Sequence, residues 1–497
     1  MPDWVLPLSF ITLLGEFRPA FTVPSFASFT TLVTGWIFAV GAHRISNVLL
    51  AAGPLRTKHY SAYYRFFGEG RWSLDEVGLA FLRLVMRVQG TAGVELVLDD
   101  TLCRRSGKKV ALGMMHADPL LRYKGKPVHR YGHVFVILAI HVVKSAVAKT
   151  GWALPFMFRL FESSKAGGQK DSRSALKRAA SRRRHQAPQR QRVRKIDREA
   201  VDGEVVECAP RPDTGPLPEN LRPTKLQLGA QMVLKVARAL PKQRVQAVAD
   251  HAYNGRAFVH GVLSEVNNVV LILRGHPDAA LFELPPPRSG QRGRPRCKGR
   301  RLPNPEQWAA SHAKAFRSVI VEMYGNDVTL EVASYVGMAY RTLPGRLVKY
   351  VIVRDPTGVY KTTYLMCTDP TMADEAIVRA YSHRWPLETA IQEAKQKLDM
   401  QDPQTQLPAS VRRTAPFALL TYSLIVWWYI TEGFKVAQML GPQATPWYHK
   451  KTRPSFTDML ATLRRAGWTQ GFLTQGLLTT PRSKIFADYL AQVVAAA

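Results

Sequence analysis

Four residues in the carboxyl-terminal third of the chain combine a tyrosine, two cations and a carboxylate at fixed intervals. They lie in the stretch Y-S-H-R-W-P-L-E-T-A-I-Q-E-A-K, as Tyr381, Arg384, Glu388 and Lys395. Steps of four and seven residues return to one face of a helix, so Arg384, Glu388 and Lys395 could form a single stripe. Such a stripe presents one potential metal ligand between two cations.

The dipeptide Trp385-Pro386 interrupts this stretch. A residue before proline is disfavoured in the helical conformation, whereas proline is well placed in the first turn of a helix. We therefore predict that one helix ends near Arg384 and that another begins with Pro386 in its first turn. The stripe then crosses a helix junction.

Two further places put acids at the ends of short apolar runs. The run V-E-L-V-L-D-D-T ends in Asp99 and Asp100, and R-V-Q-A-V-A-D ends in Asp250. Adjacent residues of a strand point to opposite faces, so one of Asp99 and Asp100 can aim at a site, and alternation alone does not choose between them. The plain alternative is an Asp-Asp-Thr turn that merely ends the strand.

Two strand-terminal aspartates and a helix-borne glutamate are the groups that a two-metal phosphoryl-transfer site needs. Mg²⁺ prefers oxygen ligands and usually takes few carboxylates. Two such ions about 4 Å apart can activate a water or a 3′-hydroxyl and stabilise the leaving oxygen.

Composition supports a polyanionic partner. The chain of 497 residues has 69 Lys and Arg against 37 Asp and Glu, a formal net charge of +32. Nucleic acid is the simplest partner, and a membrane surface is the other candidate. Residues 165–198 hold 13 of these cations and two aspartates. We interpret this run as a solvated loop that binds phosphates; a purely solvated run is the alternative.

Cysteine usage and hydropathy bear on the compartment. The four cysteines, Cys103, Cys208, Cys297 and Cys367, are far apart and form no C-x-x-C pair, which fits a reducing compartment and argues against a zinc module. The amino terminus has no signal-peptide pattern. The apolar stretches 26–42 and 416–430 approach membrane length, but polar residues interrupt them, so we predict buried helices.

The four-residue spacing, with Y-S-H-R-W around it, resembles the Tyr-Arg-Glu-Lys signature of insertion-sequence transposases of the Asp-Asp-Glu class. Their catalytic domain has a ribonuclease-H-like fold. The stretches L-D-D-T and V-A-D precede the signature in that family's order, and the resemblance covers about residues 90–400. It implies an α/β fold with a ribonuclease-H-like mixed sheet and helices, interrupted by an antiparallel β insertion and flanked by helical amino- and carboxyl-terminal regions.

The resemblance also implies roles for single residues. The acid directly before threonine, Asp100, matches the first catalytic aspartate, while Asp250 and Glu388 match the second and third acids. These three would hold two Mg²⁺ ions, for which Mn²⁺ can substitute. In the family the tyrosine, arginine and lysine of the signature contact DNA near the cut end, which carries over to Tyr381, Arg384 and Lys395. Trp308 is a candidate for stacking on a flipped base, with core packing as the alternative.

The implied domain order has five parts. Residues 1–90 form a helical DNA-binding region, for which a plain helical cap on the core is the alternative. Residues 91–280 form the first part of the catalytic core, with a basic and proline-rich loop at 165–222. A β-rich insertion follows at 281–370, the second part of the core at 371–405, and a helical region at 406–497.

The resemblance implies a DNA transposase that cleaves transposon ends and joins their 3′-hydroxyls to target DNA, by a cut-and-paste route with a hairpin intermediate. Its partners would be double-stranded DNA, as transposon ends and target, and a second copy of the chain in a homodimer, without a membrane. The expected location is the bacterial cytoplasm, at the nucleoid. The alternatives are a metal-dependent nuclease of the same fold without strand transfer and a catalytically inert DNA-binding protein.

Overall fold

The structure is a computed structural model that describes residues 6–90, 93–107, 110–123, 125–162, 222–286, 296–323, 325–440 and 453–474. The basic loop predicted at 165–198 lies outside the described residues, as does most of the basic stretch from Arg288 to Arg301.

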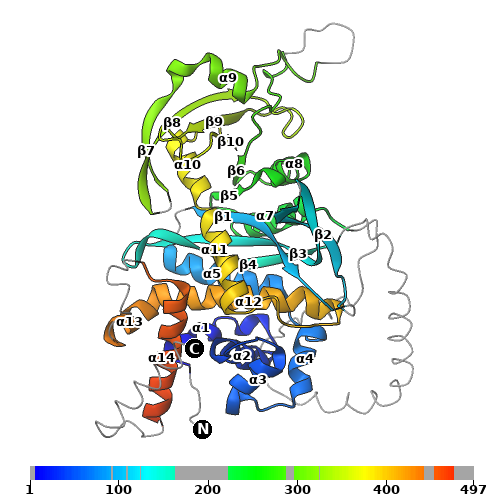
Figure 1. Ribbon diagram of the computed structural model, residues 1–497, viewed down its shortest axis with the longest axis vertical. Helices are drawn as coiled ribbons and strands as arrows, with labels where there is room; N and C mark the ends of the chain where they lie inside the picture. The colour runs from blue at the N-terminus through cyan, green and yellow to red at the C-terminus, as the bar shows by residue number, and fades with distance from the viewer. Residues whose placement is uncertain are drawn as a thin grey trace, which may run out of the picture.

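The described chain begins with five helices, of which the first four lie together at one end of the molecule and the fifth packs directly on the sheet (Figure 1). Their bounds are α1 Leu8–Gly15, α2 Val23–Phe38, α3 Ile45–Ala51, α4 Tyr60–Gly68 and α5 Leu74–Gln89. Helix α5 is capped at its start by Ser73, whose hydroxyl accepts a hydrogen bond from the Asp75 amide. These helices share one hydrophobic core with the sheet.

The segment for which the resemblance implies a catalytic core forms a sheet, with helices between its later strands. Its elements are β1 Val94–Arg104, β2 Met114–Tyr123, β3 Lys126–Lys144, β4 Ala148–Phe161, α7 Lys225–Ala239, β5 Val245–Ala249, α8 Arg256–Leu263 and β6 Val269–Arg274. Strand β3 is antiparallel to both β1 and β4, whereas β5 is parallel to β1 and β6 is parallel to β5. The spatial order β4-β3-β1-β5-β6, with helices after β4 and β5, is the ribonuclease-H-like arrangement.

The predicted antiparallel insertion continues this same sheet. After α9 (Pro305–Ser311) come β7 Arg317–Met323, β8 Asn326–Gly337, β9 Val348–Arg354 and β10 Thr363–Cys367. Strand β10 pairs antiparallel with β6, and β9, β8 and β7 follow outward. The insertion is therefore an extension of the core sheet rather than a sheet of its own, and Figure 1 shows it curling away at the end of the molecule that bears α9.

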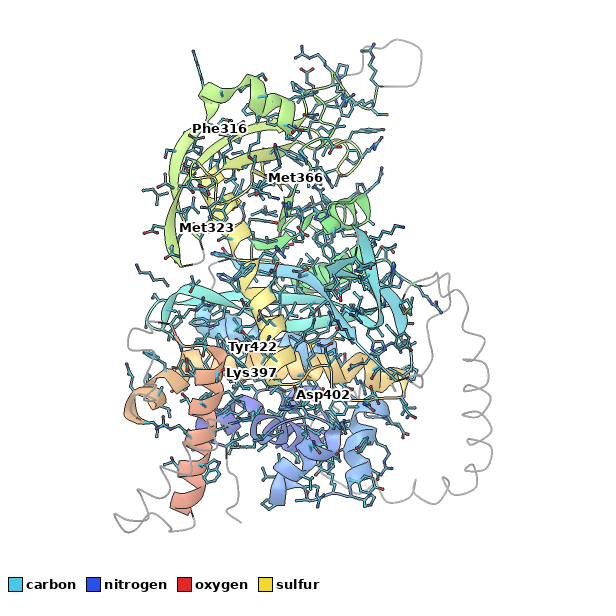
Figure 2. All side chains as sticks on the ribbon, viewed as in Figure 1. Phe316, Met323, Met366, Lys397, Asp402 and Tyr422 are labelled. Atoms are coloured by element: carbon cyan, nitrogen blue, oxygen red, sulfur yellow. The ribbon has the colours of Figure 1, made fainter. Side chains whose placement is uncertain are left out.

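Helices complete the chain and cover the sheet. They are α10 Asp374–Ser382, α11 Trp385–Lys397, α12 Pro408–Trp428, a π-helical turn Tyr429–Gly433, α13 Phe434–Leu440 and α14 Phe456–Thr474. Helix α12 lies between the sheet and the amino-terminal helices (Figure 1). Tyr422 of α12 is buried and packs its ring 4.7 Å from that of Phe456 of α14 (Figure 2).

Both apolar stretches that approach membrane length are buried helices, as predicted. Helix α2 covers the first and α12 the second, and most of their residues are buried. Among the described residues, the segment Pro408–Leu440 is long and apolar enough to cross a bilayer, but 94% of its most apolar window is buried inside the molecule. The core helix of a globular protein has the same properties.

Buried cations tie the amino-terminal helices to the rest. Arg413 of α12 is buried and donates hydrogen bonds to the carbonyl oxygens of Phe66, Gly70 and Trp72. Arg464 of α14 likewise donates to the carbonyl of Ile37 at the end of α2. Residues 1–90, as far as the structure describes them, therefore cap the core instead of standing apart from it.

Candidate functional site

The predicted helix break is present and it orients the signature. Helix α10 ends at Ser382 and α11 begins at Trp385, with Pro386 in its first turn. Across this junction Arg384 and Glu388 remain on the same side, because Nη2 of Arg384 lies 2.5 Å from Oε1 of Glu388. The stripe predicted from the spacing thus survives the break.

The strand register explains why acids from β1 and β5 meet. The parallel pairing of these adjacent strands ends at Leu98 opposite Ala249, so Asp99 and Asp250 are the next residues on each strand. Asp250 keeps an extended backbone, with φ −73° and ψ 172°. Residues paired in a parallel sheet point to the same face, so the register directs both side chains to one side.

Arg384 is the cation that interacts with the acids on this face. Its Nη1 lies 2.8 Å from Oδ2 of Asp99, and its charge also acts on Glu388 and Asp250. Burial lowers the pKa of Arg384, but these carboxylates outweigh it, so the pKa is raised overall. We call Asp99, Asp250, Glu388 and Arg384 the acidic cluster.

The pKa values of the two aspartates of the acidic cluster shift in opposite directions. Burial raises the pKa of Asp99 to about 6, against the opposing charge of Arg384. Burial also raises the pKa of Asp250, but the backbone amide of His251 and the charge of Arg384 outweigh it, so the pKa lies below its ordinary value. Asp250 is therefore ionised at neutral pH.

One carboxylate oxygen of Asp250 indicates a place for a ligand. Its Oδ2 lies 3.0 Å from Nδ1 of His251, whereas its Oδ1 is buried and has no hydrogen-bond partner in the described part of the chain. An ionised oxygen without a partner is costly to bury. A buried carboxylate oxygen without a partner is the kind of donor that Mg²⁺ takes.

Asp100 lies on the opposite face of β1. Its Oδ2 accepts a hydrogen bond of 2.6 Å from Nζ of Lys225 at the start of α7, and its Oδ1 accepts one of 3.3 Å from the hydroxyl of Tyr253. Arg384 therefore pairs with Asp99 and Glu388, with the charge of Asp250 nearby, whereas Asp100 contacts Lys225 and Tyr253 instead.

The remaining residues of the signature are held within the protein. Lys395 donates from Nζ to the Thr101 hydroxyl at 2.7 Å and to the Leu102 carbonyl at 3.0 Å. Tyr381 is half-buried beside the extension of the sheet. Burial raises the pKa of Tyr381, while Arg384 acts in the opposite direction.

Trp308 lies away from the acidic cluster, on α9 of the sheet extension. Its ring stacks on His312 at 4.5 Å and on Tyr335 at 4.6 Å, with interplanar angles of 5° and 7°. His312 is exposed and Trp308 is half-buried. A base could stack on Trp308 only by displacing one of these rings, of which His312 is the more accessible.

Two sets of residues around these acids were not predicted from the sequence. One is the pair Lys225 and Tyr253 that holds Asp100. The other is a Glu95–His141–His383 cluster on the same face of β1 as Asp99. The alternation of side chains along β1 could have indicated Glu95, because Glu95, Asp99 and Thr101 point to the same face of the strand. The partners come from distant elements and could not be found from spacing.

A comparison with models of protein families identifies the family of this chain. A family model described as DDE superfamily endonuclease matches residues 16–326. The chain therefore belongs to the DDE superfamily endonucleases. The matched range contains Asp99, Asp100 and Asp250 but ends before Glu388.

The other comparisons add little. No curated protein matches the sequence. A solved structure described as a piggyBac transposase synaptic complex with hairpin DNA is similar at 11% sequence identity, over 98% of this chain and 81% of that one, with a TM-score of 0.36. A score this low supports no argument about the fold or the function of this protein.

Proposed function

We propose that this protein is a DNA transposase of the Asp-Asp-Glu class. The observation that carries the proposal is the ion pairing of Arg384 with Asp99 and Glu388, beside Asp250, whose charge also acts on Arg384 and whose buried Oδ1 has no partner among the described residues. Membership of the DDE superfamily endonucleases and the net charge of +32 support a nucleic-acid substrate.

We assign the metal ligands as Asp99, Asp250 and Glu388. The family signature favours Asp100 as the first acid, whereas the face of β1 shared with Arg384 and Lys395 favours Asp99. Two Mg²⁺ ions, or Mn²⁺ in their place, would activate a water or a 3′-hydroxyl and stabilise the leaving oxygen when bound.

The chain's own groups have separate tasks in this proposal. The three carboxylates supply oxygen ligands from two rigid strands and one helix, which fixes their geometry. Arg384 balances their charge before DNA arrives and is placed to bind a phosphate when the carboxylates gain another partner. Tyr381 and Lys395 support the junction and the strand beside the cut end, and Trp308 is a candidate for stacking on a base.

The finer features of transposition belong to the same proposal. The element ends would be cleaved through a hairpin intermediate, and the freed 3′-hydroxyls would be joined to target DNA. A homodimer would bring the two ends together in the bacterial cytoplasm, at the nucleoid. Terminal inverted repeats bounded by short direct repeats in the DNA flanking the gene would support a transposase over a nuclease.

The ligand assignment is tested by cleavage of DNA that carries the flanking ends, in Mg²⁺ and in EDTA. Asp99→Asn, Asp250→Asn and Glu388→Gln should each lower the cleavage rate by about 10³-fold or more while end binding persists. Glu393→Gln, on the same helix as Glu388, is the matched control.

The first ligand is decided by comparing Asp99→Asn with Asp100→Asn. We expect Asp100→Asn to keep most of the cleavage activity, and the reverse order would return the role to Asp100. Precleaved ends then separate the classes: joining to target DNA supports a transposase, cutting without joining supports a nuclease, and binding without cutting in Mg²⁺ would refute both.

A further inference from the structure

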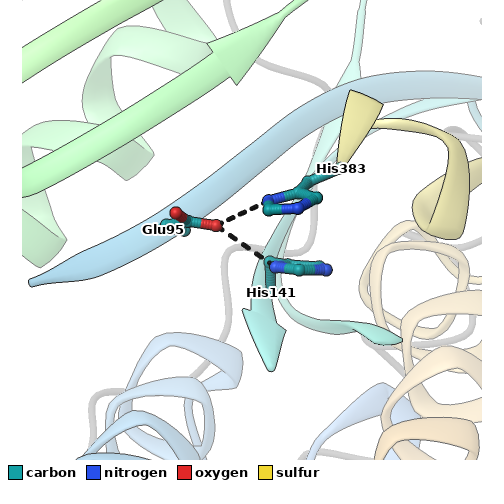
Figure 3. Close-up of side chains that lie close together, drawn as sticks. All are labelled: Glu95, His141 and His383. Carbon is teal, nitrogen blue, oxygen red and sulfur yellow. Dashed lines mark hydrogen bonds and ion pairs between the residues drawn. The ribbon is translucent and has the colours of Figure 1, made fainter. Parts of the chain in front are cut away.

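The side chains of Glu95, His141 and His383 form a cluster (Figure 3). Oε2 of Glu95 lies 2.8 Å from Nδ1 of His383 and 3.2 Å from Nδ1 of His141. The two imidazole rings stack with their centroids 3.9 Å apart and an interplanar angle of 17°. Glu95 comes from β1, His141 from β3, and His383 from the junction between α10 and α11.

The chemistry of the cluster is that of a carboxylate that accepts two hydrogen bonds. Burial raises the pKa of Glu95, but the bonds from His141 and His383 outweigh it and hold the pKa well below its usual range. Burial lowers the pKa of His141, whose Nε2 is buried without a partner in the described residues. His141 is therefore neutral, with its proton on Nδ1 facing Glu95.

A metal ion fits this cluster poorly. An ion bound by Nδ1 must lie near the plane of each imidazole, and two nearly parallel rings 3.9 Å apart do not share such a position. The cluster also faces a cavity of about 580 Å³ that Lys149, Arg379 and Arg453 help to line. These positively charged side chains would repel a metal cation bound to the cluster.

The location of the cluster links two parts of the acidic cluster. Glu95 precedes Asp99 by four residues and points to the same face of β1. His383 directly precedes Arg384, between the end of α10 and the start of α11. The bond from His383 to Glu95 thus joins the strand that carries Asp99 to the junction that orients Arg384 and Glu388.

We propose that Glu95 is a positioning residue that fixes the junction of α10 and α11 over β1 through His383, with His141 holding the carboxylate in place. This proposal rests on the proposed function for its effect on catalysis. Its structural part stands alone, because the bond to Glu95 restrains the junction whether or not DNA is cut.

Hydrogen exchange on the full-length protein tests the restraint without any activity. We expect Glu95→Gln and His383→Leu to raise the exchange rates of the amides of residues 383–388 by about tenfold or more. Asn places a nitrogen donor near the position of Nδ1, so His383→Asn should keep nearly wild-type exchange. Glu322→Gln, at another acid lining the cavity, is the matched control.

Cleavage of DNA ends tests the catalytic consequence. A displaced junction should lower kcat by about 10- to 100-fold in His383→Leu with KM for DNA nearly unchanged, and His383→Asn should restore it. Wild-type exchange and cleavage in both Glu95→Gln and His383→Leu would overturn the proposal. If the wild-type protein cuts no DNA, the proposed function fails while the exchange result still decides the restraint.

Equilibrium dialysis with Zn²⁺ tests the competing metal site. We expect the wild-type protein to bind no stoichiometric Zn²⁺ that the His383→Leu variant fails to bind. Stoichiometric binding by the wild-type protein that both Glu95→Gln and His383→Leu abolish would overturn the positioning role in favour of a metal site.

Discussion

Arg384 is the single residue on which the acidic cluster depends. It forms ion pairs with Asp99 and Glu388, and its side chain is 19% exposed, so the charges interact with limited screening by water. Carboxylates this close repel one another unless a cation lies among them. In the protein without bound metal, Arg384 supplies that cation.

This role predicts a distinctive response to metal in Arg384→Gln. In EDTA the variant should be less stable than the wild-type protein by about 2–4 kcal/mol, because its carboxylates lose their countercharge. Mn²⁺ should then raise its melting temperature more than that of the wild-type protein, since no arginine competes for the carboxylates. The measurement is thermal unfolding with and without Mn²⁺.

Arg379→Gln is the control for this experiment, because Arg379 is exposed on the neighbouring helix α10. Equal Mn²⁺-induced shifts in Arg384→Gln and the wild-type protein would show that Arg384 and the metal do not share ligands.

At the scale of elements, helix α5 is held to the sheet by a buried ion-pair network. Asp75, in its first turn, accepts two hydrogen bonds from Arg159 of β4, at 2.7 and 2.8 Å, and one of 2.8 Å from Lys235 of α7. Burial raises the pKa of Asp75, but the two cations outweigh it, so the pKa lies below its ordinary value. One carboxylate therefore ties together three elements.

The network predicts an acid-dependent contribution to stability. Because the folded-state pKa of Asp75 lies below the unfolded value of about 3.9, its contribution is present above that pH and is lost as the pH falls through the folded-state pKa. Asp75→Asn should lower the free energy of unfolding by about 2–3 kcal/mol at pH 7. The difference from the wild-type protein should shrink as the pH falls below about 4.

Urea unfolding at pH 7 and at pH 3 measures this difference. Other titrating groups are shared by both proteins, so their effects cancel in the comparison. Glu76→Gln, at the exposed neighbour of Asp75, should change little at either pH. A difference that is the same at both pH values would assign the effect of Asp75→Asn to packing rather than to charge.

At the scale of the whole molecule, one sheet runs through the catalytic part and its extension. The strands lie side by side in one sheet in the order β2-β3-β1-β5-β6-β10-β9-β8-β7. Helix α12 joins this sheet to the amino-terminal helices. A continuous scaffold of this kind keeps acids from distant segments in fixed relation.

The charge excess predicts a steep salt dependence of DNA binding. Each phosphate that the protein neutralises releases counterions, so the logarithm of the binding constant should fall linearly with the logarithm of the salt concentration. Deletion of residues 165–198 removes 13 cations and should lower the affinity and flatten that slope. Binding titrations at several salt concentrations measure both.

A deletion of the same segment is compared with a version in which its Lys and Arg are replaced by Gln. Equal flattening in both would assign the effect to charge. A slope that neither change alters would show that the segment makes no contact with phosphates.

The sequence by itself determined the local features of this protein. Short apolar runs that end in Asp99, Asp100 and Asp250 predicted strands, and Pro386 predicted the helix break, because both depend on backbone preferences within a few residues. Asp250 follows the end of β5 as predicted, whereas β1 continues past Asp99 and Asp100 to Arg104, so the prediction that these two acids end their strand was wrong. The resemblance implied the ribonuclease-H-like sheet that the topology shows.

Only the tertiary structure showed which acid pairs with Arg384. Strand alternation left Asp99 and Asp100 equivalent, and our proposal of Asp99 rests on the register of β1 with β5 and on the ion pair of Asp99 with Arg384. The pairing of Glu95 with His141 and His383 spans 46 and 288 residues. Register and helix crossing are fixed by burial of distant apolar surfaces, which the spacing of polar residues in one stretch does not record.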